Sequence, residues 1–272
     1  MKGHSPLALV VFLAFSSSVW ADGPFPDKAL EAAVRSSLKL DEKAPLTDEK
    51  LKDLFIFEAP DKGITDLTGL EKCPNLALVR LSKNKVANVG PLGGLKNLQS
   101  LDIAGNQIED IGPFAGLVKL QYLVIANNKV SKLDPLQGLE ALTTIDAEGN
   151  QISDLGPLKG PKRLVSLYMA KNRIQDLGPL AELKRLATLD LNDNPIEDLA
   201  PLAKLTDLNL VVMERNKVAD LTPLVEAAKA DAEGPKRFAP FLRLHLKGNP
   251  LSDKAKNEQL AALKALGVRV DF

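Results

Sequence analysis

The chain has 272 residues, long enough to bury a sizeable core, and its 35 basic side chains balance 35 acidic ones. A chain without net charge lacks the overall field that would attract nucleic acid or an anionic membrane surface. Its single cysteine excludes an internal disulfide.

The first 21 residues read as a secretory signal peptide. Lys2 precedes an apolar run, Leu7 to Phe15, and Val19 and Ala21 supply the small side chains expected before a cleavage site. The run is shorter than the roughly 20 residues that a membrane-spanning helix needs. We therefore expect cleavage after Ala21, a secreted or periplasmic product, and no stable membrane insertion of the mature chain.

Residues 22–53 are expected to form a helical cap. Between residues 26 and 40, apolar side chains such as Leu30 and Val34 recur with helical spacing. Thr47 is a suitable N-cap for a second, short helix. Such a segment would cover the exposed end of whatever core follows.

Residues 54–251 repeat on a fixed period. Asparagines recur every 22 residues, and an eighth follows after 33, at Asn84, Asn106, Asn128, Asn150, Asn172, Asn194, Asn216 and Asn249. Each lies in the pattern LxxLxLxxNxL, which is the leucine-rich repeat, and a period of this size predicts a solenoid. The leucines of the LxL strand should point inward. The asparagine amide can satisfy backbone groups of the following turn, so stacked copies should form a ladder.

The expected fold is an α/β leucine-rich repeat solenoid with a curved parallel sheet on its concave face. A proline recurs after each asparagine and favours short turns and 3₁₀ pieces on the convex face. A degenerate first copy begins at Leu54 and has Lys62 in place of the asparagine, which makes nine repeats. Cys73 falls on a core position, where it should act as a small buried hydrophobe.

The final repeat carries an insertion at about residues 225–240, either a tolerated surface bulge or a binding feature. Residues 252–272 should form the second cap: a helix started by Ser252 or Asp253, then a closing strand in which Val268, Val270 and Phe272 share a face. Residues 22–272 are thus expected to be one continuous domain.

The frame NxIxDLxPL, as in Asn172 to Leu180, resembles bacterial leucine-rich repeat proteins of the internalin type. Cytoplasmic phosphatase-regulating proteins have a similar repeat. The internalin resemblance implies a secreted or surface protein that binds other molecules.

The outward strand positions are the predicted binding surface, because a solenoid holds partners on its concave face. We expect an unknown protein or peptide to bind there. Tyrosines offer contact area with a polar tip, and the acidic centre favours a basic segment. The charged residues could instead only keep an exposed sheet hydrated. The candidate residues are Arg80, Asp102, Tyr122, Asp146, Glu148, Tyr168, Asp190, Glu214 and His245.

Other classes of function are less consistent with the sequence. Asp102, Asp146 and Asp190 lie on alternate strands, about 9.5 Å apart, and a repeated ladder residue is a poor catalytic signature. Loss of His4 with the leader leaves His245 and Cys73, too few for a zinc set. We expect a monomeric, non-enzymatic module without cofactor, catalytic residues or metal. The alternatives are a glycan- or cell-surface-binding adhesin-like protein and, more remotely, a regulatory subunit or inhibitor of an enzyme.

Overall fold

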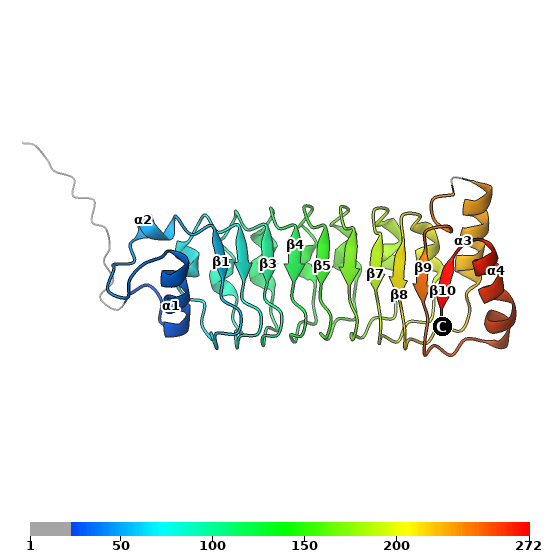
Figure 1. Ribbon diagram of the computed structural model, residues 1–272, viewed down its shortest axis with the longest axis horizontal. Coiled ribbons are helices and arrows are strands. Elements are labelled where there is room, and N and C mark those ends of the chain that lie inside the picture. Colours follow the sequence, from blue (N-terminus) through cyan, green and yellow to red (C-terminus); the bar gives the residue numbers. More distant parts are fainter. Residues whose placement is uncertain (1–22, 235) are drawn as a thin grey trace, which may run out of the picture.

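The computed structural model describes residues 23–234 and 236–272, so the predicted signal peptide lies outside the described residues. These residues form an elongated solenoid with one open parallel sheet whose strands follow chain order (Figure 1). The expected leucine-rich repeat fold is confirmed. The strands are β1 (Ile56–Glu58), β2 (Leu78–Arg80), β3 (Ser100–Asp102), β4 (Tyr122–Val124), β5 (Thr144–Asp146), β6 (Ser166–Tyr168), β7 (Thr188–Asp190), β8 (Leu210–Val212), β9 (Arg243–His245) and β10 (Arg269–Asp271).

Each strand has only three residues, and the middle one is directed into the core. In β3, Leu101 is fully buried while Ser100 and Asp102 are partly exposed. From β1 to β8, neighbouring strands pair in register with a 22-residue offset, as Leu101 does with Leu123. Residues one period apart therefore become neighbours in a row across the concave face.

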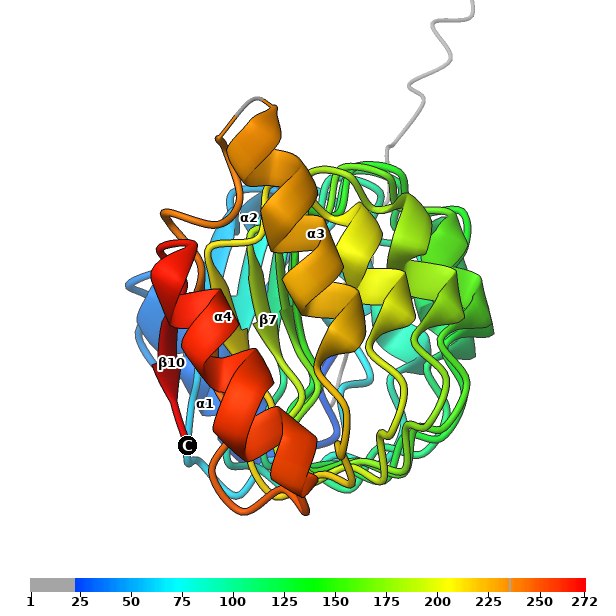
Figure 2. The same cartoon turned by 90° about the vertical axis from the view of Figure 1, so that its right-hand side faces the viewer.

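The convex side consists of short 3₁₀ pieces, as the prolines predict. Figure 2, along the solenoid axis, shows them stacked opposite the strands. Every 3₁₀ piece except the first has a proline in its first turn. The fixed φ of proline suits the start of a turn, and its missing N–H leaves no donor without a partner there. The pieces are Leu70–Lys72, Gly90–Leu92, Gly112–Gly116, Asp134–Leu136, Gly156–Lys159, Gly178–Glu182 and Ala200–Lys204.

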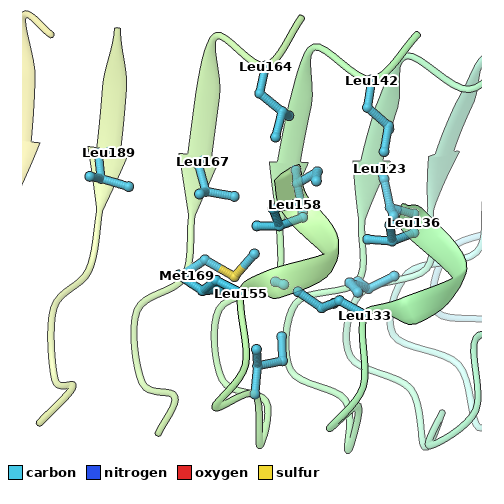
Figure 3. Close-up of a cluster of buried hydrophobic side chains, with 14 of the residues drawn as sticks. Leu123, Leu133, Leu136, Leu142, Leu155, Leu158, Leu164, Leu167, Met169 and Leu189 are labelled. Atoms are coloured by element: carbon cyan, nitrogen blue, oxygen red, sulfur yellow. The ribbon is translucent and has the colours of Figure 1, made fainter. Parts of the chain in front are cut away.

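Between the two faces, leucines from successive repeats form a continuous apolar core. Leu123 and Leu167 project from the strands toward Leu136 and Leu158 of the 3₁₀ pieces (Figure 3). Cys73 belongs to the same core and is fully buried. Each repeat buries its apolar face only against its neighbours, as expected for a solenoid.

The asparagines lie at the turn that follows each strand and link one repeat to the previous one. Asn150 Oδ1 accepts from the Val130 N–H at 2.9 Å. Its Nδ2 donates to the carbonyls of Ile125 and Ala147, both at 3.0 Å. The equivalent contacts recur along the stack, for instance at Asn106. The side chains thus satisfy buried backbone groups that the turn leaves without partners.

Two helices cover the N-terminal end of the core: α1 (Lys28–Ser37) and α2 (Asp48–Leu51). Asp27 caps α1 by accepting from two backbone N–H groups, and its other oxygen accepts from the Thr65 N–H at 2.8 Å. One carboxylate therefore both starts the helix and fastens it to the first repeat.

At the C-terminal end, the insertion lengthens the convex segment into α3 (Thr222–Glu233), which projects beyond the other repeats (Figure 2). A π-helical turn (Ala255–Gln259) leads into α4 (Leu260–Ala265), and the Ser252 hydroxyl accepts from the Ala255 N–H. Phe272 follows β10 and is 54 % exposed, with Lys264 Nζ lying 5.8 Å from the centroid of its ring.

Candidate binding surface

The parallel register gathers several predicted residues at the middle of the concave face. Asp146 of β5 pairs with Tyr168 of β6, which pairs with Asp190 of β7. Tyr122 lies in the adjacent row, next to Thr144, and its side chain is 51 % exposed. The centre of this face therefore combines two carboxylates with two phenol rings on consecutive strands.

Some acidic residues of the face have cationic partners. Arg80 contacts Glu58 at 2.7 Å and Asp102 at 3.6 Å. Lys171 contacts Glu148 at 2.6 Å. Lys171 adopts a left-handed backbone, φ 55°, at the turn just before a ladder asparagine. The turn geometry thus positions this lysine beside the face.

Asp146 and Asp190 lack such partners. Neither forms an ion pair within the described part of the chain, and each accepts only from a backbone N–H two residues on. Burial raises the pKa of Asp146 above its usual value, and the charges of Glu148, Asp102 and Asp190 add to the rise. Burial likewise raises the pKa of Asp190. Half-buried carboxylates that repel one another would be stabilised by an added cation.

Glu214 and His245 lie together at the C-terminal end of the face. His245 Nδ1 is 3.4 Å from Asp271 of β10, and Glu214 contacts Arg215 at 2.8 Å. Ligand atoms of Glu214, His245 and Asp271 fall within 4.8 Å of one another, a set that could hold a metal ion. The sequence did not predict this set, because Asp271 belongs to the closing strand and not to the repeat. Arg215 competes with any cation for the Glu214 carboxylate.

A hollow of about 730 Å³ lies where β7, β8 and β9 begin. Arg185 and Asp207 enter it from segments that precede two strands, and Arg237 and Phe241 from the end of the insertion. Sequence reasoning missed these residues because none belongs to the strand positions that define the concave face. The one available signal was the insertion, which disturbs the repeat beside this edge.

No helix in the described residues is long and apolar enough to cross a membrane. The sequence profile described as "Leucine Rich repeats (2 copies)" matches residues 74–116 and 162–204, and a "Leucine rich repeat" profile matches residues 96–152. No curated protein sequence matches the chain.

The solved structures that resemble the chain include two internalins of Listeria monocytogenes. The first, inlF, is 27 % identical with a TM-score of 0.78, over 92 % of this chain and 72 % of that one. Internalin C2 is 29 % identical with a TM-score of 0.66, over 91 % and 95 %. A leucine-rich repeat protein of Leptospira interrogans, 21 % identical with a TM-score of 0.64 over 83 % and 62 %, shares the fold. The chain is thus a leucine-rich repeat solenoid that resembles the bacterial internalins.

Proposed function

We propose that this protein is a secreted or periplasmic module that binds a basic segment of another protein on its concave face. The internalin-like leucine-rich repeat fold supports a protein-interaction module, and internalin-type proteins are secreted or surface proteins. The predicted signal peptide agrees with export. The module is non-enzymatic and acts as a monomer without cofactor.

One observation carries the choice of partner chemistry: Asp146 and Asp190 are half-buried carboxylates without a cationic neighbour among the described residues. A lysine or arginine from a partner would supply the missing charge. In a partly desolvated site such a pair is stronger than at an open surface. Tyr168 stands between Asp146 and Asp190 in the strand register, so its phenol ring would add apolar contact.

Charge alone does not define the surface, since exposed ion pairs contribute little. Tyr122 and Tyr168 offer rigid area with few rotatable bonds, which is the composition of binding hot spots. Ser100 and Thr144 flank Tyr122 in its row and leave room for a partner's side chains. We therefore assign the central contact to both tyrosines together with Asp146 and Asp190.

The test begins with affinity capture from the native envelope fraction, using the mature domain as bait. Binding of the captured protein is then measured for Asp146→Asn combined with Asp190→Asn, and for the alanine triple variant of Tyr122, Asp146 and Tyr168. Each should weaken binding at least about tenfold. Glu140→Gln is the matched control, because it removes an exposed carboxylate outside the sheet.

Affinity should also fall as the solution is acidified. Since the pKa values of Asp146 and Asp190 are raised, both carboxylates lose charge at a higher pH than ordinary aspartates. Unchanged affinity in both variants would reject the concave-face site. An empty capture together with binding on a glycan array would instead favour the adhesin-like alternative.

A further inference from the structure

The hollow at the beginning of β7, β8 and β9 has a charge opposite to that of the acidic centre. Arg185, Arg237 and Arg243 line it, and Asp207 is its one lining carboxylate. Arg269 of β10 pairs in register with Arg243 and continues the basic edge. Three arginines and a single carboxylate thus line the hollow, and a fourth arginine lies on the next strand.

The guanidinium groups of these arginines differ in whether they already have a hydrogen-bonding or ion-pair partner. Arg237 contacts Asp207 at 2.6 Å. The guanidinium groups of Arg185 and Arg243 form no hydrogen bond or ion pair with any described residue, and both residues are exposed. A guanidinium presents five N–H donors in a planar fork that matches a carboxylate in two-point contact. The hollow therefore has two guanidinium groups that are free to donate hydrogen bonds to an anionic group.

The hollow also has an apolar part. Phe241 is 63 % exposed, which is unusual for a phenylalanine, and Leu210 lines the same space. A volume of about 730 Å³ is more than a single inorganic anion needs and can admit side chains of a polypeptide. Free arginines beside an exposed aromatic ring fit an acidic residue next to an apolar one.

The hollow depends on the ordered end of the insertion. Asp231 at the end of α3 accepts from the N–H groups of Arg237, Phe238 and Ala239 at 2.9–3.0 Å. Phe238 is buried, which fastens the segment to the core. Arg237 and Phe241 are thus held at the hollow by a defined backbone.

We propose that this hollow binds an acidic, apolar segment of a polypeptide, with its carboxylates on Arg185 and Arg243 and an apolar side chain on Phe241. The occupant's class rests on the proposed function, in which the partner is a protein. The site itself is separate from the acidic centre. The protein would then bind a partner that has two oppositely charged segments, a basic one over β5–β7 and an acidic one at β7–β9.

The probe is a short fluorescein-labelled peptide in which glutamate and leucine alternate, and binding to the purified protein is followed by fluorescence anisotropy. Arg185→Ala with Arg243→Ala should weaken binding at least about tenfold. The control pair Lys162→Ala and Arg163→Ala removes the same charge outside the hollow. Arg163 occupies the position of Arg185 one repeat earlier and is also exposed.

Asp207→Asn tests the site in the opposite direction. Loss of this carboxylate releases Arg237 and removes the one acidic lining group, so affinity for the peptide should increase by about threefold or more. A matching peptide with glutamine in place of glutamate should bind neither the wild-type protein nor the Asp207→Asn variant. Added salt should weaken binding of the acidic peptide.

No measurable binding of the acidic peptide, or equal losses in the arginine pair and the control pair, would overturn the proposal. A heparin oligosaccharide that binds more tightly than the peptide and is lost in the same arginine variant would reassign the hollow to sulfated glycans. The arginine variant should still bind a lysine-rich peptide, and the Asp146 and Asp190 variants should still bind the acidic one. Failure of one site is therefore distinguishable from failure of the other.

Discussion

Replacing Asn150 by alanine should destabilise the middle of the solenoid by about 2–3 kcal/mol. Its Oδ1 is the hydrogen-bond acceptor for the buried Val130 N–H. The carbonyls of Ile125 and Ala147 each keep a second donor, from Asn128 and Asn172. The main cost is thus one buried N–H group without a partner, together with the loss of the bonds that Nδ2 donates to the carbonyls of Ile125, Ala147 and Glu148.

Thermal unfolding followed by circular dichroism measures the effect. For a protein of this size, the loss should lower Tm by roughly 5–10 °C. Gln151→Ala is the control: it removes the neighbouring amide, whose contact with Arg173 is exposed, and should change stability by less than about 0.5 kcal/mol. Equal destabilisation by the two substitutions would refute the claim that the ladder amide stabilises the fold through buried backbone groups.

Asn150→Asp separates hydrogen bonding from shape. A carboxylate keeps an acceptor for Val130 but loses both donors to Ile125 and Ala147, and it brings charge beside two carbonyl oxygens. Its pKa should therefore be raised, since the environment favours the protonated form. The variant should be least stable at neutral pH and recover as the pH falls. A stability deficit independent of pH would contradict this account.

Three further outcomes follow from single side chains. The pKa of Asp146 is raised in the folded protein, so the native state binds more protons than the unfolded chain. Stability should therefore decrease as the pH rises from the ordinary aspartate pKa through the raised pKa of the folded state. Asp146→Asn should raise Tm at neutral pH, with the gain vanishing below the ordinary aspartate pKa. Burial raises the pKa of the Cys73 thiol to about 12, so a thiol reagent should react only as fast as the protein unfolds; rapid labelling of native protein would contradict the burial. Burial would raise the pKa of Asp231, but three backbone N–H donors outweigh it and lower that pKa. Asp231→Ala should therefore lower the urea midpoint, and the difference from wild type should narrow as acid protonates the carboxyl group; an unchanged midpoint at neutral pH would argue against the cap.

The candidate surface could be predicted wherever the repeat applies. Asp146, Tyr168 and Asp190 occupy the same position in successive repeats, and the uniform 22-residue register makes them neighbours. Their electrostatic state was not readable from the pattern. Lys171 contacts Glu148 from a turn with a left-handed backbone, whereas the equivalent turn residue one repeat earlier is Gly149, which has no side chain to pair with a carboxylate.

The sequence by itself determined the solenoid, the direction of each strand side chain and the burial of Cys73. It could do so because every repeat contacts only its neighbours, so a position in the period corresponds to a position in space. That correspondence ends at the insertion, where β8 and β9 pair with a 33-residue offset. Only the tertiary structure decided that Arg237 and Phe241 meet Arg185 at one hollow, and that Asp271 meets His245. These contacts join an insertion and a cap to distant repeats, and no local period encodes them.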